Sequence, residues 1–365
     1  MVLTRCFTYN QANYITDAMN GFVMQQTNFP FVCTIVDDAS TDGEQAVIRE
    51  YVCANFDLQD ISVAYEKDEE YGQITFARHK TNENCFFAVL YLKENHRSQK
   101  KSKLQYLNEW TDYAKYIALC EGDDYWTDPL KLQKQVDFLE GHKEYIMCSH
   151  NYIKYYENTN AFEDHPWYYY CFKDNESQII NYSLDEYFMR WWTQPLTCMY
   201  RNGEYLRNIP RTKYKSFRDD IFYYYVLKEG LGALFSDVMG VYRINDGGIW
   251  QGKDVVSQYK AGRDNALDIY INENDERALC RVYRDEMGIV ISLWSEQYRW
   301  KALKEVVSYK RLVPKVHYRR FLRSVYEWFW GKMKRKAKAV FKTRLEFVFD
   351  NKGNVVNNSV LLNEG

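Results

Sequence analysis

The chain has 365 residues and a mass of 43.9 kDa; 46% of its residues are hydrophobic and 27% are charged. This length allows roughly two domains, and the composition is typical of a globular protein and excludes a wholly disordered chain. No apolar stretch approaches the roughly 20 residues that span a bilayer, and the first ten residues lack the apolar core of a secretory signal. We therefore expect a cytoplasmic protein.

The net charge of −2 is unevenly distributed along the chain. Residues 310–344 contain 13 Lys and Arg against one acid, Glu327, so this segment carries about +12 and the remainder about −14. A basic segment on an acidic body indicates an anionic surface as a partner. The nine cysteines form no Cys-x-x-Cys pair, which favours reduced, buried thiols over a disulfide framework or a thiolate zinc site.

Hydrophobic patterns in the first 65 residues predict strands and helices in alternation, at about residues 1–9, 14–26, 31–36, 44–55 and 61–65. The second of these strands is a continuous apolar run, as expected of a strand buried on both faces of a parallel sheet. The β-α-β-α-β order predicts right-handed crossovers within such a sheet.

Beyond residue 65, the sequence predicts a polar loop at 66–80, a helix at about 83–93 and an apolar strand at 116–120. Another helix begins after Asp128 and Pro129, because Asp128 can cap it and Pro129 fits its first turn. The remaining predicted helices lie at about residues 183–191 and 219–228 and within 258–309.

Acidic residues directly follow two of the predicted parallel strands. Asp37 and Asp38 follow the strand at 31–36, and a second acidic group, which begins at Glu121, follows the strand at 116–120. Ligands of open α/β sheets bind outside the carboxyl ends of the strands, so we expect these acids to line one crevice. Carboxylates at one site repel each other, and Mg²⁺ or Mn²⁺ would relieve that repulsion. The alternative is that these acids are turn residues and helix caps.

Three segments carry a resemblance to a known family: Phe7-Thr8-Tyr9-Asn10, Val36 to Gly43 (VDDASTDG) and Ala118 to Trp126 (ALCEGDDYW). Together they resemble the family-2 glycosyltransferases of bacterial polysaccharide and glycan biosynthesis. The resemblance implies an α/β fold of the GT-A type, which is Rossmann-like, with a mostly parallel sheet flanked by helices. The sequence itself contains neither GxGxxG nor GxxxxGK[ST], so a classical dinucleotide fold or P-loop is not expected.

The resemblance, which covers about residues 1–250, and the sequence pattern beyond it together predict a domain organisation. Residues 1–250 would form the GT-A domain, with the nucleotide-sugar half at 1–130 and the acceptor half at 131–250. A helical extension would follow at 251–309, and a basic, aromatic, amphipathic tail at 310–365.

Site residues follow from the resemblance position by position. The nucleotide would be bound by Thr8, Tyr9, Asn10, Asp37, Asp38 and Asp123. Tyr9 would flank the nucleobase, and Asp38 would accept a hydrogen bond from it. Asp124 would bind the metal ion, Mn²⁺ or Mg²⁺, together with Asp123 and Glu121. Glu121 stands where the family usually has aspartate.

The family also uses a general base at the start of a helix in its acceptor half. Asp219 fits that position, with Asp220 as the alternative. A carboxylate in a partly desolvated site gains basicity and can take a proton from a hydroxyl group. The competing interpretation is an acid that complements the helix dipole. A late acceptor or phosphate loop would include Arg243, Asp246 and Trp250, and Trp192 would border the acceptor.

The expected reaction transfers a sugar from a nucleotide-diphosphate sugar, with uridine diphosphate as the carrier, to a hydroxyl of a glycan or lipid-linked acceptor. A single displacement with an aspartate base would invert the anomeric configuration. The alternatives are a nucleotidyltransferase and a catalytically inactive sugar-binding or scaffold protein. A nucleotidyltransferase usually has a glycine-rich basic loop near its first strand, where this chain has Tyr9-Asn10-Gln11.

Residues 310–344 alternate apolar, aromatic and basic side chains in a pattern typical of an amphipathic helix. Such a helix can lie on an anionic membrane surface, which would place the enzyme at the inner face of the cell membrane. The alternative is a solvated helix docked on the acidic body. Nucleic acid is not an expected partner.

Overall fold

The computed structural model describes residues 1–164, 172, 177–189, 193–245, 247–248, 252–344, 348–349 and 355–356, with side chains as far as Gly331. The chain divides into two compact units. Unit 1 comprises Met1–Asp254 and Asp264–Arg281, and unit 2 comprises Val255–Arg263 and Val282–Gly365. Unit 1 thus contains residues 264–281 of the predicted helical extension.

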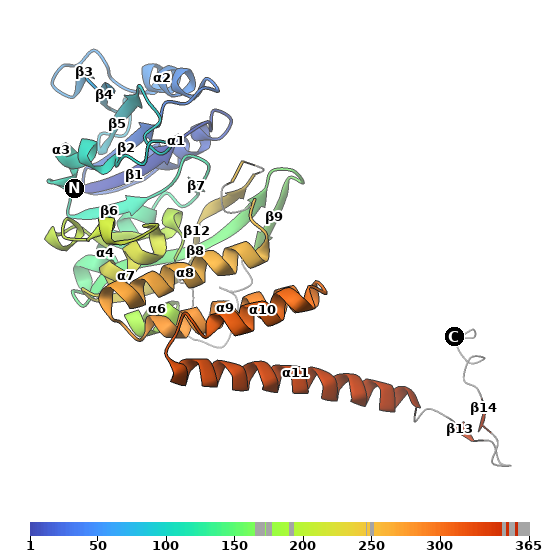
Figure 1. Ribbon diagram of the computed structural model, residues 1–365. Helices are drawn as coiled ribbons and strands as arrows, with labels where there is room; N and C mark the ends of the chain where they lie inside the picture. Colours follow the sequence, from blue (N-terminus) through green and yellow to red (C-terminus); the bar gives the residue numbers. More distant parts are fainter. Residues whose placement is uncertain are drawn as a thin grey trace. The chain divides into compact units, whose positions relative to one another are not determined.

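Unit 1 is built on a mixed sheet, and most of its strands are labelled in Figure 1. Its strands are β1 (Val2–Thr8), β2 (Phe31–Asp37), β3 (Ala64–Glu69), β4 (Gly72–Arg78), β5 (Cys85–Leu92), β6 (Tyr116–Leu119), β7 (Tyr125–Trp126), β8 (Tyr145–Tyr156), β9 (Ala161–Asp164), β10 (Ile179–Tyr182), β11 (Met199–Arg201) and β12 (Leu231–Ile244). The strand order is β10-β12-β8-β11-β6-β1-β2-β5-β4-β3, with β7 beside β12 and β9 beside β8.

Short helices connect these strands. They are α1 (Ile15–Val23), α2 (Glu44–Asn55), α3 (Asn108–Thr111), α4 (Lys131–Gly141), α6 (Leu184–Met189) and α7 (Asp219–Leu227). The 3₁₀ helices are η1 (Leu104–Leu107), η2 (Pro195–Thr197), η3 (Glu204–Leu206) and η4 (Arg211–Lys213). Two longer helices, α8 (Val255–Glu273) and α9 (Ala278–Ser295), each contribute residues to both units.

The parallel centre of the sheet positions the candidate site. Strands β6, β1, β2 and β5 are parallel neighbours in that order, and β2 is buried along its whole length. The chain passes from β1 to β2 on one side and returns to β6 on the other, so the strand order reverses at β1. This is the switch point at which ligands of α/β sheets bind. The predicted α/β class with a parallel central sheet is confirmed.

Two predictions about the edge of the sheet were wrong. The segment predicted as a helix at 83–93 is strand β5, because an apolar run of this length fits a buried strand as well as a helix. The predicted loop at 66–80 contains most of the antiparallel hairpin β3–β4. The third parallel strand is therefore β5 and not the segment at 61–65.

Unit 2 is helical. It contains the first turns of α8, most of α9, then α10 (Arg299–Tyr309) and α11 (Lys315–Arg344), followed by a short pair of strands, β13 (Val348–Phe349) and β14 (Val355–Val356). Phe321 of α11 is fully buried and packs against Tyr283 of α9 and Tyr309 of α10. Arg263 pairs with the buried Glu286 at 2.7 Å. None of the described helices is long and apolar enough to cross a membrane.

Candidate active site

The loops that follow β1 and β2 are joined by one buried carboxylate, Glu44, in the first turn of α2. Glu44 accepts hydrogen bonds from the Thr8 hydroxyl, from the Gln11 backbone amide at 2.9 Å and from the Ser40 hydroxyl at 2.7 Å. Burial raises the pKa of Glu44, and these donors oppose that shift. Glu44 therefore fixes the predicted nucleotide loops relative to each other.

The loop after β1 presents an aromatic side chain to solvent. Asn10 has a positive φ of 54°, and its side-chain oxygen accepts a hydrogen bond of 2.7 Å from the Thr41 amide. The Asn10 amide in turn donates to the Ser40 hydroxyl at 2.9 Å. Tyr9 is 42% exposed, so its ring is free to stack on a flat ligand.

Asp38 lies in the loop after β2 and is buried by residues 94–103, which we call the clamp loop. Its carboxylate accepts hydrogen bonds from the His96 amide at 2.8 Å and the Arg97 amide at 3.1 Å, and it pairs with Lys103 at 2.8 Å. Burial by itself would raise the pKa of Asp38, but the Lys103 ammonium group and the two amides lower it below the usual value. Asp38 is therefore held as an anion.

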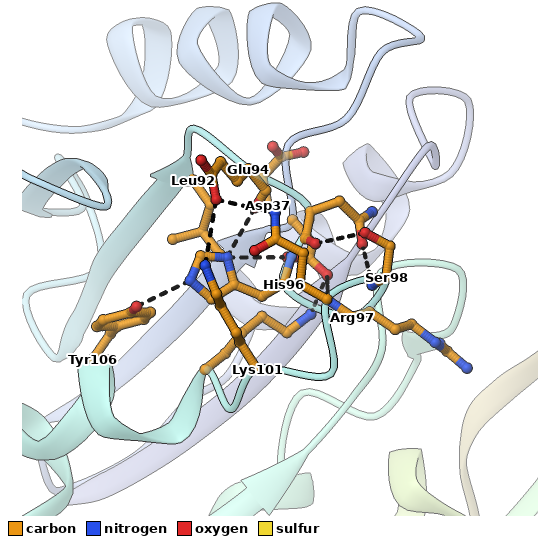
Figure 2. Close-up of polar contacts among 12 residues, drawn as sticks. Asp37, Leu92, Glu94, His96, Arg97, Ser98, Lys101 and Tyr106 are labelled. Carbon is orange, nitrogen blue, oxygen red and sulfur yellow. Dashed lines mark hydrogen bonds and ion pairs between the residues drawn. The ribbon is translucent and has the colours of Figure 1, made fainter.

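Figure 2 shows the clamp loop around His96. The His96 ring lies between the Glu94 carbonyl oxygen at 2.9 Å and the Tyr106 hydroxyl at 3.0 Å. The Arg97 side chain extends away from this network, while its backbone amide is bound to Asp38. The clamp loop thus fixes the Arg97 backbone and leaves its guanidinium group exposed.

Asp37, the last residue of β2, is fully buried. One of its carboxylate oxygens accepts hydrogen bonds from the Gln45 amide group at 2.5 Å and the Ser40 backbone amide at 3.1 Å. The other oxygen has no hydrogen-bond donor among the described residues. A buried carboxylate oxygen without a donor is costly, so a ligand that donates a hydrogen bond here would be favoured.

The segment Glu121–Asp124, which we call the acid turn, follows β6 beside the loop after β1. A side chain at Gly122 would approach the Thr8 hydroxyl oxygen to 2.4 Å and the Gln11 side-chain oxygen to 2.6 Å, so only glycine fits without movement. Trp126 then anchors the end of the segment, because it is buried and its indole N–H donates to the Leu196 carbonyl at 2.9 Å.

Arg243 of β12 holds the acid turn from the other side. Its backbone amide donates to Asp124 at 2.9 Å, and its Nε donates to the Asp123 carbonyl at 2.8 Å. Its guanidinium group pairs with Asp17 at 2.6 Å and with Glu157. Arg243 was predicted as an acceptor or phosphate contact, but it is buried and paired with two acids, so its contacts are those of a residue that positions the acid turn.

The carboxylates of the acid turn have raised pKa values. Burial raises the pKa of Asp123. Burial and the neighbouring charge of Asp123 raise the pKa of Asp124 well above its usual value. The pKa of Glu121 is raised to about 8, by desolvation first and then by the charges of Asp219 and Asp123. Glu121 is an exposed residue, so water offsets part of this desolvation, and the charges of the two neighbouring carboxylates sustain the upward shift.

The two candidate bases at the start of α7 differ in their contacts. Asp220 is largely buried and binds Arg281 at 2.9 Å and the Asn265 amide group at 3.1 Å. The pKa of Asp219 is raised to about 6 by desolvation and by the charge of Asp220, against the opposing charges of Arg218 and Arg97. Asp219 is exposed, so water offsets part of this desolvation, and the neighbouring charge of Asp220 sustains the upward direction of the shift. Asp219, and not Asp220, is therefore available to a substrate.

Arg97 is linked to three of the predicted acids, to one through its backbone and to two through its charge. The charge of Arg97 lowers the pKa of both Glu121 and Asp219, and the Arg97 amide is bound to Asp38. The predicted Asp246, Trp250 and Trp192 lie outside the described residues.

Oxygen ligands for a divalent cation are present, but they are few. No group of three His, Cys, Asp or Glu side chains among the described residues is gathered closely enough to hold a metal ion. When both are ionised, Glu121 and Asp123 carry adjacent negative charges that a cation would neutralise, and their raised pKa values are consistent with this repulsion. Mg²⁺ is commonly bound by one or two carboxylates with substrate phosphates as further ligands, so these residues fit such an ion.

Four residues of this site were missed by the sequence analysis: Gln11, Glu44, Arg97 and Lys103. Glu44 stands two residues after Asp42, at the start of the predicted helix. An acid at that position interacts favourably with the helix dipole, so the sequence could have indicated a structural role for Glu44. Arg97 and Lys103 lie in a basic polar segment, and nothing in that segment predicts a contact with Asp38. No feature of the sequence predicts a role for Gln11.

Residues 7–193 match the model of a protein family that is described as "Glycosyl transferase family 2". An uncharacterized protein of Mycobacterium tuberculosis is 30% identical over 250 residues, which cover 67% of this chain and 58% of that protein. The chain belongs to glycosyl transferase family 2. The chain spans little more than half the length of this curated relative.

Solved structures share the fold. Staphylococcus aureus TarS 1–349 in complex with UDP-GlcNAc has a TM-score of 0.52 and 17% sequence identity, and the match covers 87% of this chain and 82% of that chain. A longer TarS structure has a TM-score of 0.50 and 16% identity, covering 87% of this chain and 50% of that one. The family and these neighbours together identify the fold as GT-A, as the resemblance implied.

Proposed function

We propose that the chain is an inverting glycosyltransferase that transfers a sugar from a uridine-diphosphate sugar to a hydroxyl group of a glycan or lipid-linked acceptor. The observation that carries this proposal is that Asp219 of the acceptor half lies close enough to Glu121 to raise its pKa. In this proposal, two acids from chain segments about 100 residues apart would share one site beside the loops that follow the central strands.

The nucleotide would bind at the loops after β1 and β2. The exposed ring of Tyr9 would stack on the base, and the carboxylate oxygen of Asp37 that lacks a described donor would accept a hydrogen bond from it. Asp38, which was predicted for that contact, is buried and bound by the clamp loop, so it would fix this loop instead. We choose uridine because TarS, which shares the fold, was solved with UDP-GlcNAc. The exposed guanidinium group of Arg97 would bind the diphosphate.

Asp219 would act as the general base. Its carboxylate takes the proton of the acceptor hydroxyl while that oxygen forms a bond to the anomeric carbon. The bond from this carbon to the diphosphate oxygen breaks at the same time, and the nucleoside diphosphate leaves on the opposite face. A pKa near 6 suits this task, because the carboxylate is ionised at neutral pH yet more basic than an ordinary aspartate.

A divalent cation would be held by Asp123 and Glu121 together with the diphosphate. When bound, it would neutralise charge that develops on the departing diphosphate. Asp124 was predicted as a ligand of the ion, but it is buried and bound by the Arg243 amide, so we propose that it supports the acid turn from behind. Arg97 and Lys103 would add positive charge on the side of the clamp loop.

The proposal is tested by the product released from the donor. Nucleotide sugars are first screened by thermal shift with Mn²⁺, since a ligand that binds only the native state raises its stability. The donor that stabilises the protein is then incubated with candidate acceptors, and we expect release of the nucleoside diphosphate to depend on the acceptor. Release of pyrophosphate would indicate a nucleotidyltransferase instead, and stabilisation without any release would indicate a binding protein.

We also propose that α11 rests on an anionic membrane surface. Val316, Tyr326 and Trp330 are 67%, 65% and 46% exposed on this helix, and the rings of Tyr326 and Trp330 stack with their centroids 6.3 Å apart. Basic residues surround them in the sequence, and each contributes about 1 kcal/mol near an anionic leaflet. A membrane location would suit a lipid-linked acceptor.

Cosedimentation with vesicles tests the membrane proposal. The full chain should bind phosphatidylcholine vesicles only when they contain phosphatidylglycerol, and the double substitution Tyr326→Ser and Trp330→Ser should weaken binding. Trp300→Ser on α10 is the matched control, because Trp300 is 85% exposed but lies outside the basic segment. Equal binding by all three proteins, or no binding by the full chain, would contradict the proposal.

A further inference from the structure

Helix α4 begins with a lysine that is fully buried. The Nζ of Lys131 has no hydrogen-bond partner among the described residues, and it lies 3.8 Å from the centre of the Trp126 ring. Burial lowers the pKa of Lys131 to about 8. No described carboxylate forms an ion pair with Lys131, so the described part of the chain offers its charge only the electron-rich face of the Trp126 ring.

The titratable groups whose charges would act on Lys131 are neutral at pH 7. They are the thiols of Cys120, Cys198, Cys148 and Cys33 and the ring of His150. Burial raises the pKa of each thiol and lowers that of the histidine. An ammonium group without an ion pair or a hydrogen bond destabilises the fold, and an apolar residue of similar size would be more stable in its place. Lys131 therefore indicates a role other than stability.

Lys131 contacts a residue that lies just beyond the acid turn. Trp126 stands two residues after Asp124, and other contacts already restrain it. Its indole N–H donates to the Leu196 carbonyl at 2.9 Å, and its ring lies edge-on to Phe22, with the ring centres 5.0 Å apart. The ammonium group of Lys131 adds a charged contact on the face of this ring, so the side chain that ends the segment is held from several directions.

We propose that Lys131 is a positioning residue of the sugar transfer. Its ammonium group attracts the face of the Trp126 ring, which fixes the strand that leaves the acid turn and thereby the carboxylates of Glu121 and Asp123. Because Lys131 is fully buried, it acts through Trp126 and touches neither the donor nor the ion. The role in transfer rests on the proposed function, whereas the effect on the acid turn does not.

Amide hydrogen exchange on the full chain measures the acid turn directly, without any ligand. Lys131→Met removes the charge and keeps a side chain of similar length, and we expect it to raise exchange several-fold in peptides that cover residues 121–126 and not elsewhere in unit 1. Its melting temperature should equal or exceed that of the unchanged chain, because a buried, unpaired charge is removed.

Lys134→Met is the matched control for this measurement. Lys134 lies on the same helix, but it is partly exposed and pairs with Asp128 at 2.8 Å and with Asp237 at 3.2 Å. Its loss should leave exchange in the acid turn unchanged and should not raise the melting temperature. Lys131→Arg keeps the charge, so its exchange should stay closer to that of the unchanged chain, and this variant serves if the methionine variant does not fold.

Binding of Mg²⁺ connects the position of the acid turn with the reaction. In the presence of uridine diphosphate, calorimetry should show roughly tenfold weaker Mg²⁺ binding to Lys131→Met, as for other residues that support metal ligands from behind, and unchanged binding to Lys134→Met. The ratio of the affinities of the unchanged chain and Lys131→Met should fall towards one as the pH rises from about 7 to about 9, because Lys131 loses its proton near pH 8. Titration of Glu121 occurs in both proteins and cancels in this ratio.

The outcomes separate this proposal from the proposed function. Unchanged exchange in the acid turn of Lys131→Met would overturn it, as would a lower melting temperature with faster exchange throughout unit 1, which is the result of a merely structural role. Faster exchange with unchanged Mg²⁺ binding, or an affinity ratio that does not change with pH, would overturn the role in transfer. If the unchanged chain binds no Mg²⁺, the metal site of the proposed function fails, and the exchange measurement alone decides whether Lys131 positions the acid turn.

Discussion

The site contains two kinds of acidic turn that look alike in the sequence and differ in their surroundings. Asp38 is surrounded by donors: two backbone amides and the Lys103 ammonium group bind it, and its pKa is lowered. Glu121 faces other acids, and its pKa is raised to about 8. The protein therefore compensates the negative charge of Asp38 in full, but it does not compensate that of Glu121.

This difference separates a structural role from a binding role. A compensated carboxylate stabilises the fold, and in this structure Asp38 fixes the clamp loop that carries Arg97. Crowded carboxylates without a counter-charge destabilise the free protein and gain from a cation or a proton. We therefore expect substitutions at Asp38 to act mainly on stability and substitutions in the second group to act mainly on activity.

The largest effect is expected from Asp219→Asn. Loss of a general base should reduce kcat by roughly 10²- to 10⁴-fold, while the affinity for the nucleotide donor stays near normal. The transfer rate of the unchanged enzyme should fall as the pH drops below about 6, because Asp219 then becomes protonated. Steady-state kinetics and donor titration measure the two effects.

Asp220→Asn is the matched control for the base. Asp220 binds the guanidinium group of Arg281, so its loss should lower stability by leaving Arg281 with a weaker partner. Its kcat should fall much less than that of the Asp219 variant. The opposite order of the two kcat values would remove Asp219 from the mechanism.

The next effect concerns the compensated carboxylate. Asp38→Ala leaves Lys103 and the amides of His96 and Arg97 without their acceptor, and breaking a buried pair of this kind typically costs about 3–5 kcal/mol in the free energy of unfolding. Since the folded-state pKa of Asp38 is lowered, its contribution should be present above the ordinary aspartate pKa near 4 and lost as the pH falls below it. Urea unfolding at pH 7 and at pH 3 measures both.

Asp42→Ala provides the comparison for Asp38. Asp42 is an exposed residue of the same loop, and it accepts hydrogen bonds from the amides of Ala12 at 2.9 Å and Glu44 at 3.1 Å. Its loss should cost about 1 kcal/mol, as for a helix-capping residue. Equal losses for Asp38→Ala and Asp42→Ala would contradict the distinction between the two turns.

A smaller effect is expected where the acid turn touches the loop after β1. Gly122→Ala would place a methyl group 2.4 Å from the Thr8 hydroxyl oxygen, so the acid turn and the loop after β1 must move apart. Overpacking of this kind typically costs about 1–3 kcal/mol in stability. Gly141→Ala is the control, because nothing lies within 4 Å of the added methyl group. Similar melting temperatures for the two variants would show that the contact is loose.

The acids at the strand ends could be predicted because the signal is local. An apolar run followed by acidic residues describes both β2 with Asp37 and β6 with Glu121, and parallel strands place their carboxyl ends at one edge. The start of α7 at Asp219 was equally local. These features needed only the order of residues along the chain.

The compensation of Asp38 could not be predicted, because its donors are backbone amides 58 and 59 residues away. Every residue except proline has such an amide, so the sequence carries no mark of the contact. Arg243 meets Asp124 across 119 residues in the same way, through its backbone amide. Strand β5 was mistaken for a helix because its unbroken apolar run lacks the alternation that separates the two structures.

The smallest expected effect is on the pH dependence of stability, which Asp219 influences beside Glu121. Since the folded-state pKa of Asp219 is raised to about 6, the folded chain holds this proton more tightly than the unfolded chain does, and raising the pH from about 4 to 6 costs stability. Asp219→Asn removes this cost and one of the charges that act on Glu121. The variant should therefore melt at the same temperature as the unchanged chain near pH 4 and at a slightly higher temperature at pH 7.

Added Mn²⁺ should reduce this difference in melting temperature at pH 7 if a cation compensates the same acids. If the variant instead melts at a lower temperature than the unchanged chain at pH 7, the ionised Asp219 stabilises the fold, as Asp38 does, and the distinction between the two carboxylates is wrong.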